Sequence, residues 1–137
     1  MNRKLARENL FLLLFEGVAR PDATAEEIFE LAVKERDLQT DDYVKNVFFG
    51  VYEKRSEIEA LIEPALVGWK ANRLSVAARA ILRLSTYELG FMEDIPPLVS
   101  INEAVELAKR YDDEKSYAFI NGVLNAVATA CGRKDAK

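Results

Sequence analysis

The sequence predicts an all-α fold: a single domain built as a bundle of about seven helices. Apolar residues recur every three or four positions through most of the 137 residues, which is the spacing of a helix that buries one face. Signatures of a helix start, in which Ser, Thr or Asp precedes an apolar run, also recur along the chain. No segment alternates apolar and polar residues as a half-buried strand does. Half of the residues are hydrophobic and 31% are charged, as in a globular domain with one core.

The first two helices are expected before residue 40. The first carries an apolar stripe at helical spacing, formed by Leu5, Leu12, Phe15 and Ala19 and widened by Phe11 and Val18. Arg20 and Pro21 end this helix, because the residue before a proline is driven out of helical geometry. Thr24 and Glu27 have the spacing of a capping box, so they mark the start of the second helix.

The next two helices are expected between residues 40 and 66. Thr40 or Asp41 can cap the third helix. Its apolar positions are Tyr43, Val47, Phe48 and Val51. Ser56 and Glu59 have the spacing of another capping box, so the fourth helix is expected to begin after Ser56. Pro64 is expected to bend or shorten it, because proline lacks the backbone donor that a helix interior needs.

Two amphipathic helices are expected in the middle of the second half. Ser75 is the expected cap of the first, which ends near Gly90. Pro97 fits the first position of the second, where a missing N–H has no consequence. That helix is expected to run to about Tyr111.

The last helix is expected from about Ser116 to Ala130, followed by a disordered tail over residues 132–137. Gly122 lies inside this helix, where glycine costs roughly 1 kcal/mol relative to alanine. We therefore expect it to let another helix approach closely. No linker or low-complexity segment divides the chain, so residues 1–137 are expected to form one domain.

The composition excludes several classes of site. The chain has no histidine, which excludes catalysis and zinc binding that depend on an imidazole. Its one cysteine, Cys131, cannot form an internal disulfide. No apolar stretch reaches the ~20 residues of a membrane span, and the N-terminal run LFLLLF is too short for a signal peptide. We therefore expect a cytoplasmic protein without catalytic residues, metal or cofactor.

Charge is distributed unevenly along a chain whose net charge is −4. Residues 22–63 are strongly acidic, whereas Arg3, Lys4 and Arg7 make residues 1–7 a basic segment. Exposed charges act over about 10 Å in salt, so a basic end can attract a polyanion in spite of the net charge. The alternative is that these charges lie on solvated helix faces, and charge by itself favours this alternative.

Several polar residues are expected to be structural. They are Arg83, Glu88, Asn102 and Glu103, and the surface set Glu106, Lys109 and Arg110. A buried Arg–carboxylate contact between helices is one expected arrangement, and such a pair fixes how helices dock more than it stabilises them. The surface set has the i,i+3 and i,i+4 spacing of pairs that contribute a few tenths of a kcal/mol.

The start of the last helix combines Lys115 and Ser116 with the aromatic residues Tyr117 and Phe119. Backbone donors at a helix N-terminus bind phosphate oxygens, and an aromatic ring can stack on an unpaired base. The alternative is that Phe119 belongs to the core and Tyr117 is a surface ring. The residues by themselves favour the alternative.

Four segments of the chain together resemble the NusB family of bacterial transcription antitermination factors. They are ARENLFLLLF, LRLSTYEL, IPPLVSINEAVELAK and SYAFINGVLN. The resemblance implies a helical bundle that binds the boxA element of ribosomal RNA transcripts together with NusE, a small-subunit ribosomal protein. It also implies a non-enzymatic role with the RNA polymerase elongation complex and other Nus factors, in read-through of ribosomal RNA operons.

The resemblance implies a set of RNA-binding residues. They are Arg3, Lys4 and Arg7 of the basic segment, and Lys115, Ser116, Phe119 and Asn121 at the start of the last helix. Among them, Phe119 is the implied base-contacting ring. The basic segment is expected to contact phosphates, which set affinity and salt dependence rather than sequence preference.

The resemblance implies NusE contacts at Phe15, Arg79 and Arg83. The glutamine and tyrosine usual in the family's first helix are Leu12 and Phe15 in this chain. Family members commonly have an acidic residue near the start of the helix that carries Arg83, and in this chain that position is Ala78. These departures leave the expected fold unchanged but alter the details of the NusE contact.

Two other interpretations stay open. A helical scaffold that binds only protein is favoured by the acidic pI of about 5.0 and by the few basic residues at the N-terminus. NusB-like domains also precede the catalytic domain of some ribosomal RNA cytosine methyltransferases, but that interpretation needs a downstream methyl-donor-binding domain, and the chain stops at Lys137. An exposed apolar first helix would also allow the free protein to form a homodimer.

Overall fold

The structure is a computed structural model that describes residues 1–66, 68 and 74–133. Over these residues the chain forms seven α-helices, one short 3-10 helix (η1) and no strand. The elements are α1 (Arg3–Ala19), α2 (Ala25–Arg36), α3 (Asp42–Glu53), α4 (Arg55–Ile62), η1 (Glu63–Ala65), α5 (Val76–Phe91), α6 (Pro97–Tyr111) and α7 (Ser116–Ala130). The predicted all-α fold of about seven helices is confirmed.

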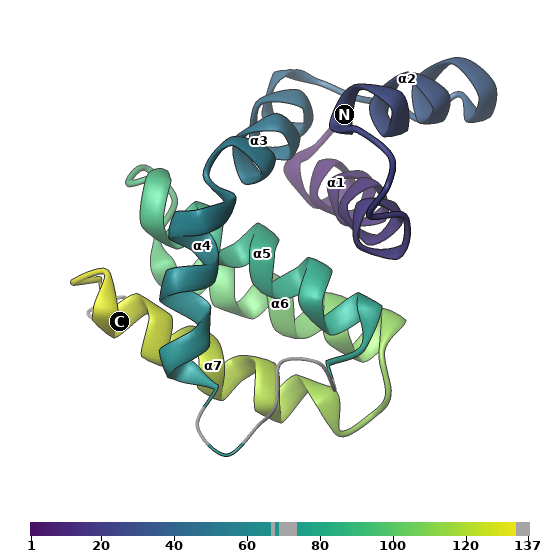
Figure 1. Ribbon diagram of the computed structural model, residues 1–137. Coiled ribbons are helices and arrows are strands. Elements are labelled where there is room, and N and C mark those ends of the chain that lie inside the picture. The colour runs from purple at the N-terminus through teal and green to yellow at the C-terminus, as the bar shows by residue number, and fades with distance from the viewer. Residues whose placement is uncertain (67, 69–73, 134–137) are drawn as a thin grey trace.

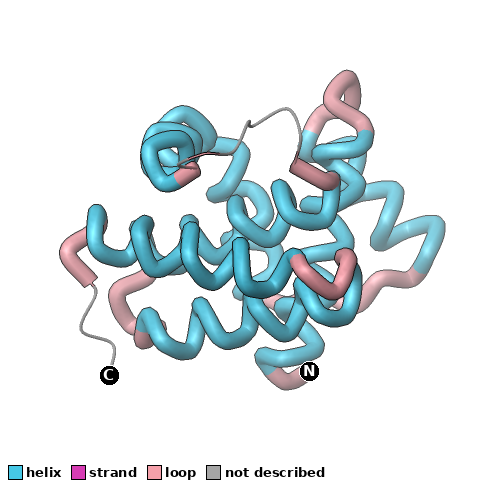
Figure 2. The backbone as a smooth tube through the Cα atoms, turned by 90° about the horizontal axis from the view of Figure 1, so that it is seen from below, coloured by secondary structure: helices cyan, strands magenta, loops and turns pink. Residues whose placement is uncertain are grey.

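Helix α5 is the centre of the bundle. It packs against α1 and α3 and also against α4, α6 and α7. In Figure 1, α1–α3 form an upper group and α4–α7 a lower group, and short loops join the helices in Figure 2. Ten of the sixteen residues of α5 are buried, including the small residues Ala77, Ala80 and Ser85. A helix surrounded by neighbours needs such residues on most of its faces.

Most of the expected helix starts are confirmed. Thr24 and Glu27 form the full capping box of α2. Asp41, rather than Thr40, caps α3, and Ser75 caps α5. Pro97 is the first residue of α6, as expected.

The expected start of the fourth helix at Ser56 is wrong. Helix α4 begins at Arg55, directly after Lys54, and has no side-chain cap. Because Lys54 alone separates α3 from α4 and is not extended, no residue is available to act as a cap. Glu59 pairs with Arg83 on α5 instead of reaching back to Ser56. The expected effect of Pro64 is confirmed, since the α-helix ends before it and continues as the 3-10 turn η1.

The apolar stripe of α1 lies mostly in solvent. Leu5 and Leu12 are each 40% exposed and Phe15 is 38% exposed. The buried positions include Leu10 and Leu14 on other faces of the helix. The apolar residues of α1 are spread over several of its faces, so helical spacing alone does not select the face that enters the core.

The expectation for Gly122 is also wrong. A Cβ atom added there would have no neighbour within 4 Å, so this side of α7 faces open space. Close approach occurs at Gly50 on α3, where an added Cβ would lie 2.5 Å from the Tyr87 hydroxyl oxygen of α5. Gly50 is therefore a glycine at which two helices pack closely, and so is Gly17 of α1, where an added Cβ would collide with the Tyr52 hydroxyl of α3.

Gly50 and Gly122 give a matched pair of substitutions. We expect Gly50→Ala to lower the free energy of unfolding by about 1–3 kcal/mol, because the Tyr87 ring must move. Gly122→Ala is expected to raise it by up to about 1 kcal/mol, since alanine is the better helix former. Urea denaturation of both variants measures the difference, and equal changes in the two variants would contradict the assignment of the close contact to Gly50.

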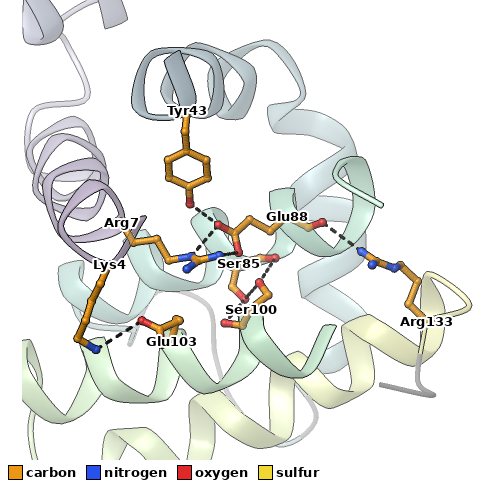
Figure 3. A network of polar contacts seen from close by, with 8 residues as sticks. All are labelled: Lys4, Arg7, Tyr43, Ser85, Glu88, Ser100, Glu103 and Arg133. Atoms are coloured by element: carbon orange, nitrogen blue, oxygen red, sulfur yellow. Dashed lines mark hydrogen bonds and ion pairs between the residues drawn. The ribbon is translucent and has the colours of Figure 1, made fainter. Parts of the chain in front are cut away.

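The start of the expected disordered tail is fixed to the bundle. The Arg133 guanidinium donates hydrogen bonds to backbone carbonyls at and after the end of α5, with 3.0 Å to Leu89 and 2.6 Å to Ile95, and Figure 3 shows this side chain directed at α5. The disorder expected at residues 132 and 133 is therefore wrong, while residues 134–137 lie outside the described residues. Within the described ranges, no helix is long and apolar enough to cross a membrane.

Candidate nucleic-acid interface

A buried ion pair joins α1 to α5. Arg7 Nε lies 3.0 Å from Glu88 Oε2, and Arg7 Nη2 lies 3.3 Å from Glu88 Oε1. The hydroxyl of Tyr43 on α3 donates to the same carboxylate (Figure 3). Glu88 is fully buried and Arg7 is 5% exposed. The expected buried Arg–carboxylate contact between helices is confirmed for Glu88, with Arg7 rather than Arg83 as its partner.

This environment holds Arg7 charged inside the bundle. Burial acts to lower the pKa of Arg7, but the attraction and hydrogen bond of Glu88, together with the interactions of Tyr43 and Glu103, outweigh it and the pKa is raised. Burial, together with repulsion from Glu88, raises the pKa of the Tyr43 hydroxyl, which stays protonated and donates. The guanidinium of Arg7 is engaged with Glu88 and so holds α1 on α5. Arg7 also lines a hollow between α1 and α6, and its expected phosphate contact stays a prediction.

Arg3 and Lys4 remain on the surface beside this ion pair. The guanidinium carbon of Arg3 lies 4.0 Å from the centre of the Tyr43 ring, a cation–π contact. Lys4 Nζ lies 3.7 Å from Oε1 of Glu103 on α6, and the Lys4 side chain is 70% exposed (Figure 3). Glu103 thus contacts a neighbouring helix, as expected, and the two cations stay accessible to a ligand.

The residues expected at the start of α7 differ in exposure. Lys115 and Asn121 are exposed, whereas Ser116 and Phe119 are half-buried. The Ser116 hydroxyl donates to Asp112 at 2.6 Å, and Phe119 packs against the core. Tyr117 is 41% exposed, so it is the more accessible of the two rings.

Side chains at the end of α6 contact both α1 and α7, although the sequence predicted only surface pairs there. Lys109 Nζ lies 5.0 Å from the centre of the Tyr117 ring on α7. Arg110 Nη1 lies 3.2 Å from a carboxylate oxygen of Glu8 on α1, and the Tyr111 hydroxyl donates to the same carboxylate. The sequence signal is the basic and aromatic run KRY shortly before the last helix.

These side chains make up a surface that we call the basic face. It consists of Arg3, Lys4, Lys109, Arg110, Tyr111, Lys115 and Tyr117, all of them exposed. Between α1 and α6 it contains a hollow of about 240 Å³ lined in part by Lys4, Glu8 and Arg110. Cations contact phosphates and exposed rings stack on bases, so this face has the chemistry of a single-stranded nucleic-acid site.

Arg79 and Arg83 of α5 lie in a second region, which we call the arginine pocket. It is a hollow of about 250 Å³ that is also lined by Arg55 and Tyr52. Arg83 Nε lies 3.0 Å from Glu59 Oε2. Burial lowers the pKa of Arg83 and is opposed by the attraction of Glu59, while Arg55 and Arg79 lower it further by repulsion.

Phe15, the third residue expected to contact a protein partner, does not line the arginine pocket. It lies with Leu12, Ala19 and Leu38 along an apolar groove of about 430 Å³ between α1 and α2. The structure therefore brings Arg79 and Arg83 together, and it places Phe15 at a separate, apolar surface of α1.

Comparison with known proteins gives a consistent result. The sequence matches the NusB family over residues 2–129. A protein of Clostridium perfringens (strain 13 / Type A) named transcription antitermination protein NusB is 45% identical over 131 residues, and the match covers 93% of this chain and 96% of that protein. A Bacillus subtilis (strain 168) protein of the same name is 41% identical over 127 residues, with 93% and 95% covered.

Solved structures agree with the sequence relatives. NusB of T. maritima has a TM-score of 0.85 at 39% identity, over 99% of this chain and 96% of that chain. A chain in the crystal structure of antitermination factors NusB and NusE in complex with dsRNA has a TM-score of 0.82 at 34% identity, over 93% and 96%. Since the family match and these relatives span nearly all of the sequence, the chain belongs to the NusB family.

Proposed function

We propose that this chain is a transcription antitermination factor that binds boxA-containing RNA together with NusE. In this role it promotes read-through of ribosomal RNA operons by the RNA polymerase elongation complex with other Nus factors. The observation that carries the proposal is the family match over residues 2–129, which includes every residue of the basic face. The relatives are named antitermination proteins, and a similar chain has been solved with NusE and dsRNA. The protein acts in the cytoplasm as a binding protein rather than an enzyme.

The basic face is the proposed RNA site. Arg3, Lys4 and Lys115 contact phosphates, and Lys109 and Arg110 extend the same row of cations along α6. The proposed contacts that lie beside this row are Ser116, Phe119 and Asn121 on α7. Phosphate contacts position the strand, so sequence preference requires a ring or polar group of α7 that reaches a base.

The proposed NusE surface includes the apolar groove at Phe15 and the arginines Arg79 and Arg83. A groove lined by exposed apolar side chains fits a protein partner, since interfaces bury apolar groups at their centre. Arginine is enriched in such interfaces. The groove is also the observation that favours the alternative of a scaffold that binds protein only.

One experiment separates these two functions. RNA binding is measured with boxA RNA and a scrambled RNA of equal length, with and without NusE, over a series of salt concentrations. We expect NusE to increase the affinity for boxA more than for the scrambled RNA. Equal affinities for the two RNAs in the presence of NusE would contradict the antitermination role and support the scaffold.

Tyr117 and Phe119 can be distinguished as stacking rings. We expect Tyr117→Ala to weaken boxA binding about 5- to 100-fold without loss of stability, because stacking on one ring contributes about 1–3 kcal/mol per base. Phe119→Ala is expected to lower the melting temperature, since the ring packs on the core. If Phe119→Ala weakens RNA binding more than Tyr117→Ala at temperatures where both variants are folded, Phe119 is the base-contacting ring.

A further inference from the structure

We infer that the arginine pocket binds a carboxylate side chain of the protein partner, and that Arg55 is the residue that meets it. The inference rests on the proposed partnership with NusE. It adds to that proposal a chemical class of ligand, an acidic side chain, and a residue of α4 that the family resemblance did not imply.

The pocket has unmatched positive charge. Among the described parts of the chain, Arg55 has no carboxylate within ion-pair distance. Arg83 already contacts Glu59 through Nε, and it is repelled by both Arg55 and Arg79. A carboxylate between Arg55 and Arg83 would relieve this repulsion. Guanidinium groups bind carboxylates through short, charge-assisted hydrogen bonds, so an acidic group is the ligand that suits this site.

The shape of the pocket suits one inserted side chain. Its volume is about 250 Å³, and Val18, Pro21 and Ala23 form an aliphatic wall beside the arginines. Tyr52 is held against Gly17, where an added Cβ would collide with the Tyr52 hydroxyl. An Asp or Glu side chain has methylene groups for the aliphatic wall and a carboxylate for the guanidinium groups.

The position of the pocket favours a protein partner over RNA. Lys4 of the basic face and Gly17 of the pocket belong to the same helix, and thirteen residues at 1.5 Å each separate them by about 20 Å. Phe15 precedes Val18 by three residues, so these side chains are neighbours on α1. A protein seated on exposed Phe15 can therefore reach the pocket, whereas a strand bound along the basic face lies toward the other end of α1.

The test measures the affinity of the full chain for NusE by isothermal titration calorimetry. We expect Arg55→Glu to weaken binding on the order of 30-fold, because a buried charge pair is replaced by repulsion. Arg55→Lys keeps the charge and is expected to retain most of the affinity. Lys45→Glu makes the same charge change at an exposed residue of α3 and is expected to bind as the wild type does. Circular dichroism confirms that each variant is folded.

The partner's group is found by replacing each acidic residue of NusE with its amide. One replacement is expected to cause a similar loss with the wild-type chain and no further loss with Arg55→Glu. The inference is overturned if Arg55→Glu binds NusE as tightly as the wild type, and the proposed function then stands. It is also overturned if, without NusE, Arg55→Glu lowers RNA affinity by the same factor, because the pocket then takes phosphate. A wild-type chain that does not bind NusE refutes the proposed function and the inference with it.

Discussion

Glu88→Ala is expected to lower the free energy of unfolding by about 3–5 kcal/mol, the largest loss expected from any single substitution considered for this chain. The carboxylate is fully buried and accepts hydrogen bonds from Arg7 of α1 and Tyr43 of α3. Without it, the Arg7 guanidinium stays buried as an uncompensated charge and the Tyr43 hydroxyl loses its acceptor. Guanidinium chloride denaturation measures the loss.

Two controls identify the cause of this loss. The double variant Arg7→Met with Glu88→Leu is expected to recover much of the stability, because apolar groups of similar volume replace the whole pair. Glu106→Ala breaks the exposed pair with Lys109, at 3.8 Å, and is expected to cost less than about 0.5 kcal/mol. A loss of under about 1 kcal/mol for Glu88→Ala would mean that Arg7 moves to solvent, contrary to its assigned role of holding α1 on α5.

The triple variant Arg3→Ala, Lys4→Ala and Lys115→Ala is expected to weaken RNA binding on the order of 100-fold near 0.1 M salt. Each phosphate contact with single-stranded nucleic acid contributes about −0.7 to the slope of log affinity against log salt, so the slope should become shallower by about 2. Fluorescence anisotropy with boxA RNA across a salt series measures both quantities. The fold is expected to be unchanged, because all three side chains are exposed.

A matched control removes three cations from elsewhere on the surface. Lys34→Ala, Lys45→Ala and Lys54→Ala change the net charge equally but lie on α2, α3 and at the end of α3. If the control weakens RNA binding as much as the triple variant, general attraction explains the affinity and the basic face is not the site. An unchanged salt slope in the triple variant would likewise exclude the basic face as the site.

Local signals in the sequence were sufficient for most helix boundaries. Helix caps depend on hydrogen bonds within four residues, as at Thr24 and Ser75, so they can be inferred from short segments. The place of Pro97 at the start of α6 is equally local, because proline lacks a backbone donor. The helix start predicted at Ser56 was wrong because a capping box needs an extended residue before the helix. Helix α3 runs almost directly into α4, so no such residue is present. The close helix contact predicted at Gly122 was wrong because a glycine inside a helix does not reveal whether another helix faces it.

The candidate sites depend on contacts between distant segments. Arg3 and Arg7 are chemically identical and four residues apart, yet one is exposed and the other buried. The difference is made by Glu88, which lies 81 residues from Arg7, and by Tyr43 on α3. Lys109 and Arg110 likewise resemble ordinary surface cations until α6 brings them beside α1 and α7.

Helical spacing and the capping residues were sufficient to predict an all-helical fold, because helix starts are decided by local contacts. The four segments that resemble the NusB family predicted the family, and the match over residues 2–129 confirms it. Tertiary structure alone decided which apolar residues of α1 face solvent, that Arg7 is buried against Glu88, and that Arg55 joins Arg79 and Arg83 in one pocket. Charge and hydropathy along a chain are the same for a buried and an exposed arginine, and only the packing of partners around it distinguishes the two.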